Sequence, residues 1–122
     1  METNVKEIII NGISYVPKSE TQSAKMMDGL KHVIVRTYSA GVFAGYLEKR
    51  TGQEVVLRQA RRLWYWVGAA SLSQLAADGV SNQGKCKFPV EVDKIELLQA
   101  IEIIETTEKA RQSIAGVPIW KA

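Results

Sequence analysis

The chain has 122 residues, of which 46% are hydrophobic and 24% are charged, as is usual for one soluble globular domain. Its apolar runs are far shorter than a bilayer span and its start lacks the basic-then-apolar order of a signal peptide, so we expect a cytoplasmic protein with no membrane partner. A single cysteine, Cys86, excludes an intramolecular disulfide, and a single histidine leaves no soft-metal cluster, so we expect no metal and no cofactor.

The charge is mildly basic and unevenly distributed. The formal net charge is +3, which fits a compact anionic ligand better than a long nucleic-acid track. Between Lys49 and Arg62 the basic residues outnumber the acidic ones, since Glu54 is the only acid there. The sequence therefore predicts a local positive zone in this part of the chain.

The first part of the chain predicts little core structure. The run EIIINGISYVP predicts a small N-terminal hairpin within residues 1–17, because Asn11 and Gly12 both tolerate the positive φ of a type I′ turn. Residues 18–30 are polar and weakly patterned, so we expect a flexible connector there. We expect one domain over residues 1–122, with its core in residues 31–122.

Three strands are predicted next. The runs HVIVRTYS, VFAGYLEKR and EVVLRQARRLWYWV are rich in β-branched and aromatic residues and are separated by Ala40-Gly41 and Thr51-Gly52. We expect them to be adjacent and antiparallel. If the third strand continues through its whole run, alternation places two sets of side chains on opposite faces: Arg62, Trp64 and Trp66 on one, and Arg61, Leu63 and Tyr65 on the other.

The second half of the chain predicts two helices and further strands. A helix is expected over residues 68–79, with Gly79 at its end. The run FPVEVDKIELLQAIEII supplies one or two strands, and Thr107 caps a short last helix, EKARQSIA, which Gly116 closes. The predicted fold class is α+β: a mainly antiparallel sheet with two short helices and a small N-terminal hairpin.

The basic and aromatic residues of the third strand are a candidate binding site: Arg61, Arg62, Trp64 and Trp66. Indole faces can stack on a purine while an arginine pairs with a phosphate through two parallel hydrogen bonds. The alternative is that the tryptophans pack in the core and the arginines lie at a solvated edge. The small residues of VGAAS just beyond suit either close approach of a phosphate to a helix start or close helix packing. No glycine-rich phosphate-binding motif is present.

A strand end holds a second candidate group, Arg36, Tyr38 and Ser39, followed by Gly41. Hydroxyls and exposed N–H groups at such a junction suit ribose and phosphate. The alternative is a bulge that bends the strand and binds nothing.

A third candidate group comes from the second half of the chain. A polar loop with Asn82, Lys85 and Lys87 precedes Phe88 and could cover a site. Arg111 on the last helix could reach across it. The alternative is a solvated loop and a surface arginine, because exposed charges are the default.

The residues do not predict an enzyme or catalytic residues. His32 starts a strand without an evident nucleophile beside it, and Cys86 has no nearby histidine in the sequence. The carboxylates Glu91, Asp93 and Glu96 have spacings that suit a solvated strand edge, and no loop has a calcium-binding pattern.

The runs VIVRTYSAGVFAGYLE, ARRLWYWVGAASLSQLA and TEKARQSIAGVPIW resemble a family of small phage proteins, the type-one Thoeris anti-defence proteins, over roughly residues 32–120. The resemblance implies a non-catalytic sponge that binds a cyclic ADP-ribose isomer, the alarm signal of bacterial TIR-domain enzymes, without cleaving it. It further implies a homo-oligomer built from dimers with sites at subunit interfaces, binding of cyclic trinucleotides from the related CBASS immunity, and action in the cytoplasm of an infected host.

Carried onto the matching runs, the resemblance implies ligand-binding roles for Arg36, Tyr38, Ser39, Arg61, Arg62, Trp64, Trp66 and Arg111, to which position and chemistry add Asn82 and Phe88. Two other functions stay open on the residues alone. One is a module that binds single-stranded nucleic acid through the same basic and aromatic strand. The other is a structural or interaction protein of the phage particle, in which the aromatic residues form a subunit contact.

Overall fold

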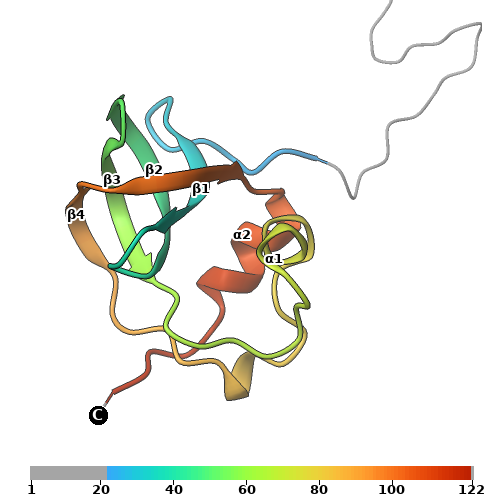
Figure 1. Cartoon of the computed structure of the whole chain (residues 1–122). Helices are drawn as coiled ribbons and strands as arrows, with labels where there is room; N and C mark the ends of the chain where they lie inside the picture. The colour runs from blue at the N-terminus through green and yellow to red at the C-terminus, as the bar shows by residue number, and fades with distance from the viewer. Residues whose placement is uncertain (1–21, 122) are drawn as a thin grey trace, which may run out of the picture.

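The computed structural model describes residues 22–121, so the hairpin expected within residues 1–17 lies outside the described residues. Five strands, two α-helices and a short 3-10 helix follow one another along the chain: β1 (Lys31–Thr37), β2 (Val42–Thr51), β3 (Glu54–Arg62), α1 (Leu72–Asp78), η2 (Gln83–Lys85), β4 (Val92–Leu97), β5 (Ala100–Glu105) and α2 (Glu108–Ala115). The predicted α+β class is confirmed, with an antiparallel sheet and two helices that lie together on one side of it (Figure 1).

The sheet is strongly curled, and its strand order shows why. The order is β4-β3-β2-β1-β5, so β4 and β5 occupy opposite edges although only Leu98 and Gln99 separate them in the chain. The two edges must therefore approach each other at this corner. Backbone bonds close it, since the amide of Tyr38 donates to the Gln99 carbonyl oxygen (2.9 Å) and the amide of Ala100 donates to that of Gln53 (3.0 Å). Strand twist accumulated across five strands favours such closure.

Curling gives the sheet two buried faces. Side chains alternate along β1, so Val33 and Val35 point into the curl while Ile34 points toward the helices. The inner cluster includes Phe43 from β2, and the helix-side cluster includes Leu75 from α1. A strand covered on both faces needs a continuous apolar run, which is why the centre of HVIVRTYS does not alternate between apolar and polar residues.

A side-chain hydroxyl caps the N-terminus of each α-helix. Ser71 caps α1 by accepting from the Gln74 amide (3.2 Å), and Thr107 caps α2 by accepting from the Ala110 amide (3.1 Å). The predicted cap at Thr107 is confirmed. The same hydroxyl donates to the Ala77 carbonyl oxygen (2.6 Å), so one side chain both starts α2 and joins it to α1. No helix of the described residues has the length and apolar character needed to cross a bilayer.

The third strand is shorter than predicted. The Leu63 amide still donates to the Val42 carbonyl oxygen of β2 (2.8 Å), but the next two amides pair with another segment, so the strand ends at Arg62. The amides of Trp64 and Tyr65 both donate to the Lys87 carbonyl oxygen (3.2 and 3.3 Å). The expected face carrying Arg62, Trp64 and Trp66 on one regular strand is therefore wrong.

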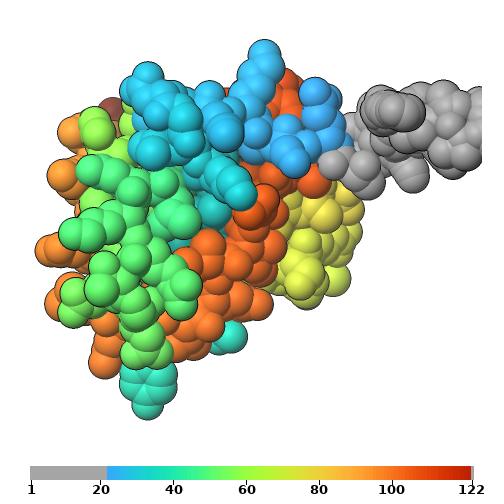
Figure 2. All heavy atoms as spheres, turned by 90° about the horizontal axis from the view of Figure 1, so that it is seen from above, coloured from blue at the N-terminus to red at the C-terminus, as the bar shows by residue number. Residues whose placement is uncertain are grey.

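The segment before β1 is joined to the start of α2. The Ala24 amide donates to the Thr106 carbonyl oxygen (3.2 Å), and the Lys25 amide donates to the Glu108 carboxylate (2.7 Å). Figure 2 shows this blue segment lying against the orange part of the chain, which includes the start of α2. Residues 22–30 thus help to position the first turn of α2.

Candidate functional site

A cavity of about 530 Å³ lies between the helix-facing side of the sheet, helix α2 and the segment that follows α2. This volume falls within the range of small-molecule sites. Its apolar wall comes from α2 and the segment after it, and from Val90. Its polar lining is His32, Tyr46, Gln59, Arg61, Glu91 and Arg111.

The pairing register of the strands places these polar side chains together. His32 of β1 is directly opposite Tyr46 of β2, and Ala44 of β2 is opposite Arg61 of β3. The His32 and Tyr46 rings meet edge to face, with centroids 5.0 Å apart. Residues two apart on a strand share a face, so Ala44 and Tyr46 both point toward α2.

A β-bulge directs Gln59 into the cavity. Ala44 pairs with Arg61 and Tyr46 pairs with Arg58, so Gln59 and Ala60 together stand opposite the single residue Gly45. Gln59 has a φ of 48°, which is unusual for a residue other than glycine, and bulges of this kind often re-aim side chains near functional sites.

Gly45 allows the bulge because it has no side chain. A Cβ there would lie 3.1 Å from both the Ala60 Cα and the Arg58 carbonyl oxygen. A larger residue would push the two strands apart at the cavity wall.

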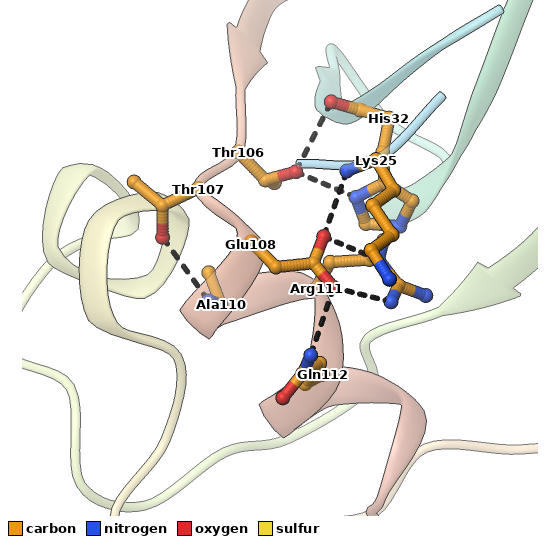
Figure 3. A network of polar contacts seen from close by, with 8 residues as sticks. All are labelled: Lys25, His32, Thr106, Thr107, Glu108, Ala110, Arg111 and Gln112. Carbon is orange, nitrogen blue, oxygen red and sulfur yellow. Dashed lines mark hydrogen bonds and ion pairs between the residues drawn. The ribbon is translucent and has the colours of Figure 1, made fainter. Parts of the chain in front are cut away.

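Arg111 is the cation of α2 that faces the cavity, and Glu108 holds it. Nε of Arg111 donates to Oε1 (2.9 Å) and Nη2 donates to Oε2 (2.6 Å) of the same carboxylate (Figure 3). The hydrogen bond from Arg111 is the main cause that lowers the pKa of Glu108 to about 2, and the Lys25 amide and the Gln112 side chain add to it. Both partners are therefore charged at neutral pH.

Some of the Arg111 surface remains open. Its side chain keeps 23% of its exposure, whereas that of Glu108 keeps 12%. The Glu108 carboxylate raises the pKa of Arg111, and the neighbouring Tyr46 contributes in the same direction. Arg111 thus offers fixed positive charge at the cavity, partly neutralised by its own ion pair.

His32 is neutral at physiological pH. Burial is the main cause that lowers its pKa from 6.5 to about 4, and the positive charge of Arg111 lowers it further. The Thr106 hydroxyl donates to the His32 carbonyl oxygen (3.1 Å) and lies 2.7 Å from Nδ1 of the ring. Because that hydroxyl has one proton, Nδ1 is the ring donor, and Nε2 is left as an acceptor.

The guanidinium of Arg61 forms its hydrogen bonds within the protein. Burial lowers the pKa of its guanidinium, whose carbon lies 5.5 Å from the centroid of the fully buried Phe88 ring. Backbone carbonyl oxygens surround the guanidinium at 2.7–3.2 Å, namely those of Phe88, Pro89, Ile114, Val117 and Pro118. Its first role is to join the end of α2 to the segment before β4.

Other residues proposed from the sequence lie in or against the turn between β1 and β2 and are not part of the cavity lining. Arg62 donates to the Ala40 carbonyl oxygen and lies over the Phe43 ring at 4.4 Å, on the inner side of the sheet. Tyr38 and Ser39 belong to the same turn, and Tyr38 is 76% exposed.

Arg36 is not part of the cavity lining that contains Arg61 and Arg111. Its side chain makes an exposed ion pair with Glu102 of β5 (2.9 Å). The structure therefore does not bring Arg36, Arg62 and Arg111 to one cavity.

The remaining proposed residues are dispersed. Trp64 is 64% exposed, while Trp66 packs against the helix-side core. Asn82 precedes η2 and is exposed. Of the residues proposed from the sequence, the cavity brings together Arg61 and Arg111.

Sequence reasoning missed four polar members of the cavity lining: His32, Tyr46, Gln59 and Glu91. The first two could have been found by writing β1 and β2 as a hairpin and pairing them residue by residue. Alternation places Gln59 on the same face as Arg61, two residues later, but no pattern in the sequence indicated that this face lines a cavity. Within residues 22–121, no group of three or more potential metal ligands gathers.

A family model described as a domain of unknown function, DUF6948, matches residues 30–114 of the chain. The match includes all five strands and most of α2, so it spans most of the cavity lining. No curated protein and no solved structure matches the chain.

Proposed function

Because the chain belongs to the DUF6948 family, whose description names no activity, we propose its function from the cavity and from the sequence resemblance. The protein binds and retains a small nucleotide signal of the cyclic ADP-ribose type without transforming it. It acts as an immune-evasion protein of a phage, in the cytoplasm of the infected bacterium, against signals made by TIR-domain enzymes.

The observation that carries this proposal is one cavity of about 530 Å³ in which a charged arginine, Arg111, is adjacent to the Tyr46 ring and to an apolar wall. A purine can pack against the ring and the wall, and a phosphate can accept from the outer edge of the guanidinium. The Nε2 atom of neutral His32 is an acceptor that suits a hydroxyl or amine donor of the ligand.

Two polar side chains of the cavity lining are held in position by other residues before any ligand binds. Glu108 holds Arg111 by two hydrogen bonds, and Thr106 holds the His32 ring. Side chains ordered before the ligand arrives lose less entropy on binding, so more of the interaction free energy appears as affinity. High affinity is what a sponge needs to compete with a receptor.

The resemblance adds two elements to the proposal. One is assembly into a homo-oligomer built from dimers, with a second subunit covering the bound ligand. The other is binding of cyclic trinucleotides at the same or another position. Native mass spectrometry reports the assembly and the bound mass in one measurement.

The experiment is titration of the full chain with cyclic ADP-ribose isomers, followed by heat denaturation and identification of the released ligand by mass spectrometry. We expect binding with recovery of the unchanged ligand. Arg111→Gln and Tyr46→Ala should each weaken binding by about tenfold or more, which is the effect expected for one charge-assisted contact or one stacked base.

Arg36→Gln is the matched control, because it removes an arginine whose exposed ion pair lies outside the cavity lining. It should bind as the wild type does. Release of a linear or hydrolysed nucleotide would make the protein an enzyme, and equal affinity of all three variants would remove the cavity from the binding site.

A further inference from the structure

Three segments outside the sheet form a small ladder of their own. Tyr65 and Lys87 pair as an antiparallel bridge, and Phe88 and Ile119 pair as a parallel bridge. The amide of Trp120 donates to the Phe88 carbonyl oxygen (3.0 Å). Segments from three distant parts of the sequence are thus held side by side.

This ladder places a lysine between two exposed aromatic rings. Nζ of Lys87 lies 5.7 Å from the centroid of the Tyr65 ring and 5.7 Å from that of the Trp120 ring. We call these three side chains the Tyr65–Lys87–Trp120 platform. A cation within about 6 Å of a ring face is attracted by it, so the lysine orders both rings.

The two aromatic rings of the platform are partly exposed and are not residues of the buried core. Tyr65 is 50% exposed and Trp120 is 38% exposed, whereas the ladder residue Phe88 is fully buried. Because neighbouring residues of an extended segment point to opposite sides, Phe88 anchors the ladder inward while Lys87 points outward. The rings are therefore available to a partner.

The platform is also cationic. Lys85 precedes it by two residues and Lys121 directly follows Trp120. None of the ion pairs found among residues 22–121 involves Lys85, Lys87 or Lys121. One lysine between two flat rings, with two more lysines within two residues of the platform in sequence, favours a partner that carries several negative charges and planar groups.

We propose that the Tyr65–Lys87–Trp120 platform binds single-stranded nucleic acid, with bases stacked on the two rings and phosphates beside the lysines. A duplex keeps its bases stacked inside, so it cannot use the rings in this way. A second copy of the chain would bring like charges together. The platform shares no residue with the cavity lining, so it stands independently of the proposed nucleotide binding.

The platform is not the basic and aromatic strand expected from the sequence. The guanidinium of Arg61 is engaged by backbone carbonyls, and Trp66 packs against the core. The residues whose chemistry suits a single-stranded nucleic acid are instead Tyr65, Lys87 and Trp120.

The test is fluorescence anisotropy of the full chain with labelled thymidine oligonucleotides of increasing length, at two salt concentrations. Affinity should rise with length and should fall about 20-fold between 50 and 200 mM salt, as expected for about three neutralised phosphates on a single strand. Tyr65→Ala and Trp120→Ala should each weaken binding by about fivefold or more. Lys87→Gln should reduce the salt dependence, because it removes one of the positive charges that neutralise phosphates.

Tyr38→Ala and Lys109→Gln are the matched controls, since they change an exposed tyrosine and a lysine of other surfaces. Both should bind as the wild type does. Binding that is equal in the platform and control variants, or absent at low salt, would overturn the proposal. Self-association that Trp120→Ala abolishes, measured by sedimentation, would assign the platform to a second copy instead.

Discussion

Arg61 and Ile114 are 53 residues apart in the sequence, yet Nη1 of Arg61 donates a 2.9 Å hydrogen bond to the Ile114 carbonyl oxygen. This carbonyl lies at the end of α2, where the last carbonyls of a helix have no intrahelical partner. A buried guanidinium with its donors in a planar fork can satisfy several such groups at once.

We expect Arg61→Lys to be strongly destabilising, because an ammonium cannot reach the same set of carbonyls and leaves buried acceptors unpaired. The loss should be about 3–5 kcal/mol of the free energy of unfolding. Urea denaturation measures it. Arg58→Lys, at a partly exposed arginine that pairs with Glu48 and Asp93, should cost less than about 1 kcal/mol. Similar losses in the two variants would contradict a structural role for Arg61.

The stability of the protein should depend on pH through His32. Its pKa is about 4 in the folded protein and 6.5 in the unfolded chain, so the unfolded state binds more protons between these values. The free energy of unfolding should therefore fall as the pH is lowered from about 6.5 to about 4, by roughly 3 kcal/mol. Urea denaturation over this pH range is the measurement. In His32→Gln the fall over this window should disappear, and its persistence would assign the titration to another group.

Glu108 should make the free energy of unfolding depend on pH in a second, more acidic range. Its pKa of about 2 lies below the ordinary value of 4.5, so its contribution is fully present above about 4.5 and is lost as the pH falls toward 2. Glu108→Gln should remove this dependence and reduce the free energy of unfolding at neutral pH by about 1–2 kcal/mol. Glu105→Gln, whose ion pair with Lys31 is largely exposed, should change it by less than about 0.5 kcal/mol. A larger effect at Glu105 than at Glu108 would contradict the structure.

Gly79 should not tolerate a side chain. It has a φ of 76°, and a Cβ there would lie 2.3 Å from the Ser113 Cβ of α2, so α1 and α2 would have to separate. We expect Gly79→Ala to lower the free energy of unfolding by about 2–4 kcal/mol, from strain and overpacking together. Gly52→Ala is the control: it has a φ of 61° but nothing within 4 Å, so strain alone of about 1 kcal/mol is expected. Equal melting temperatures for the two variants would exclude close packing at Gly79 as the cause.

The order of the elements was determined by the sequence. Turn residues separated the three β-branched runs, and Thr107 and Gly116 marked the ends of the last helix as the structure has them. These signals are local: a hydroxyl before a helix or a glycine in a turn acts within a few residues, so one sequence is enough to interpret it. The antiparallel α+β class followed from them.

The cavity and the platform were decided only by the tertiary structure. Arg61 was proposed as a phosphate ligand and instead binds backbone carbonyls from segments that no local pattern links to β3. Gln59 lines the cavity from a bulge in β3, and Tyr65 lies near Lys87, as Trp120 does, because the chain leaves the sheet after Arg62. Strand pairing over long sequence distances determines which side chains become neighbours, and that pairing depends on how the whole curled sheet buries its two faces.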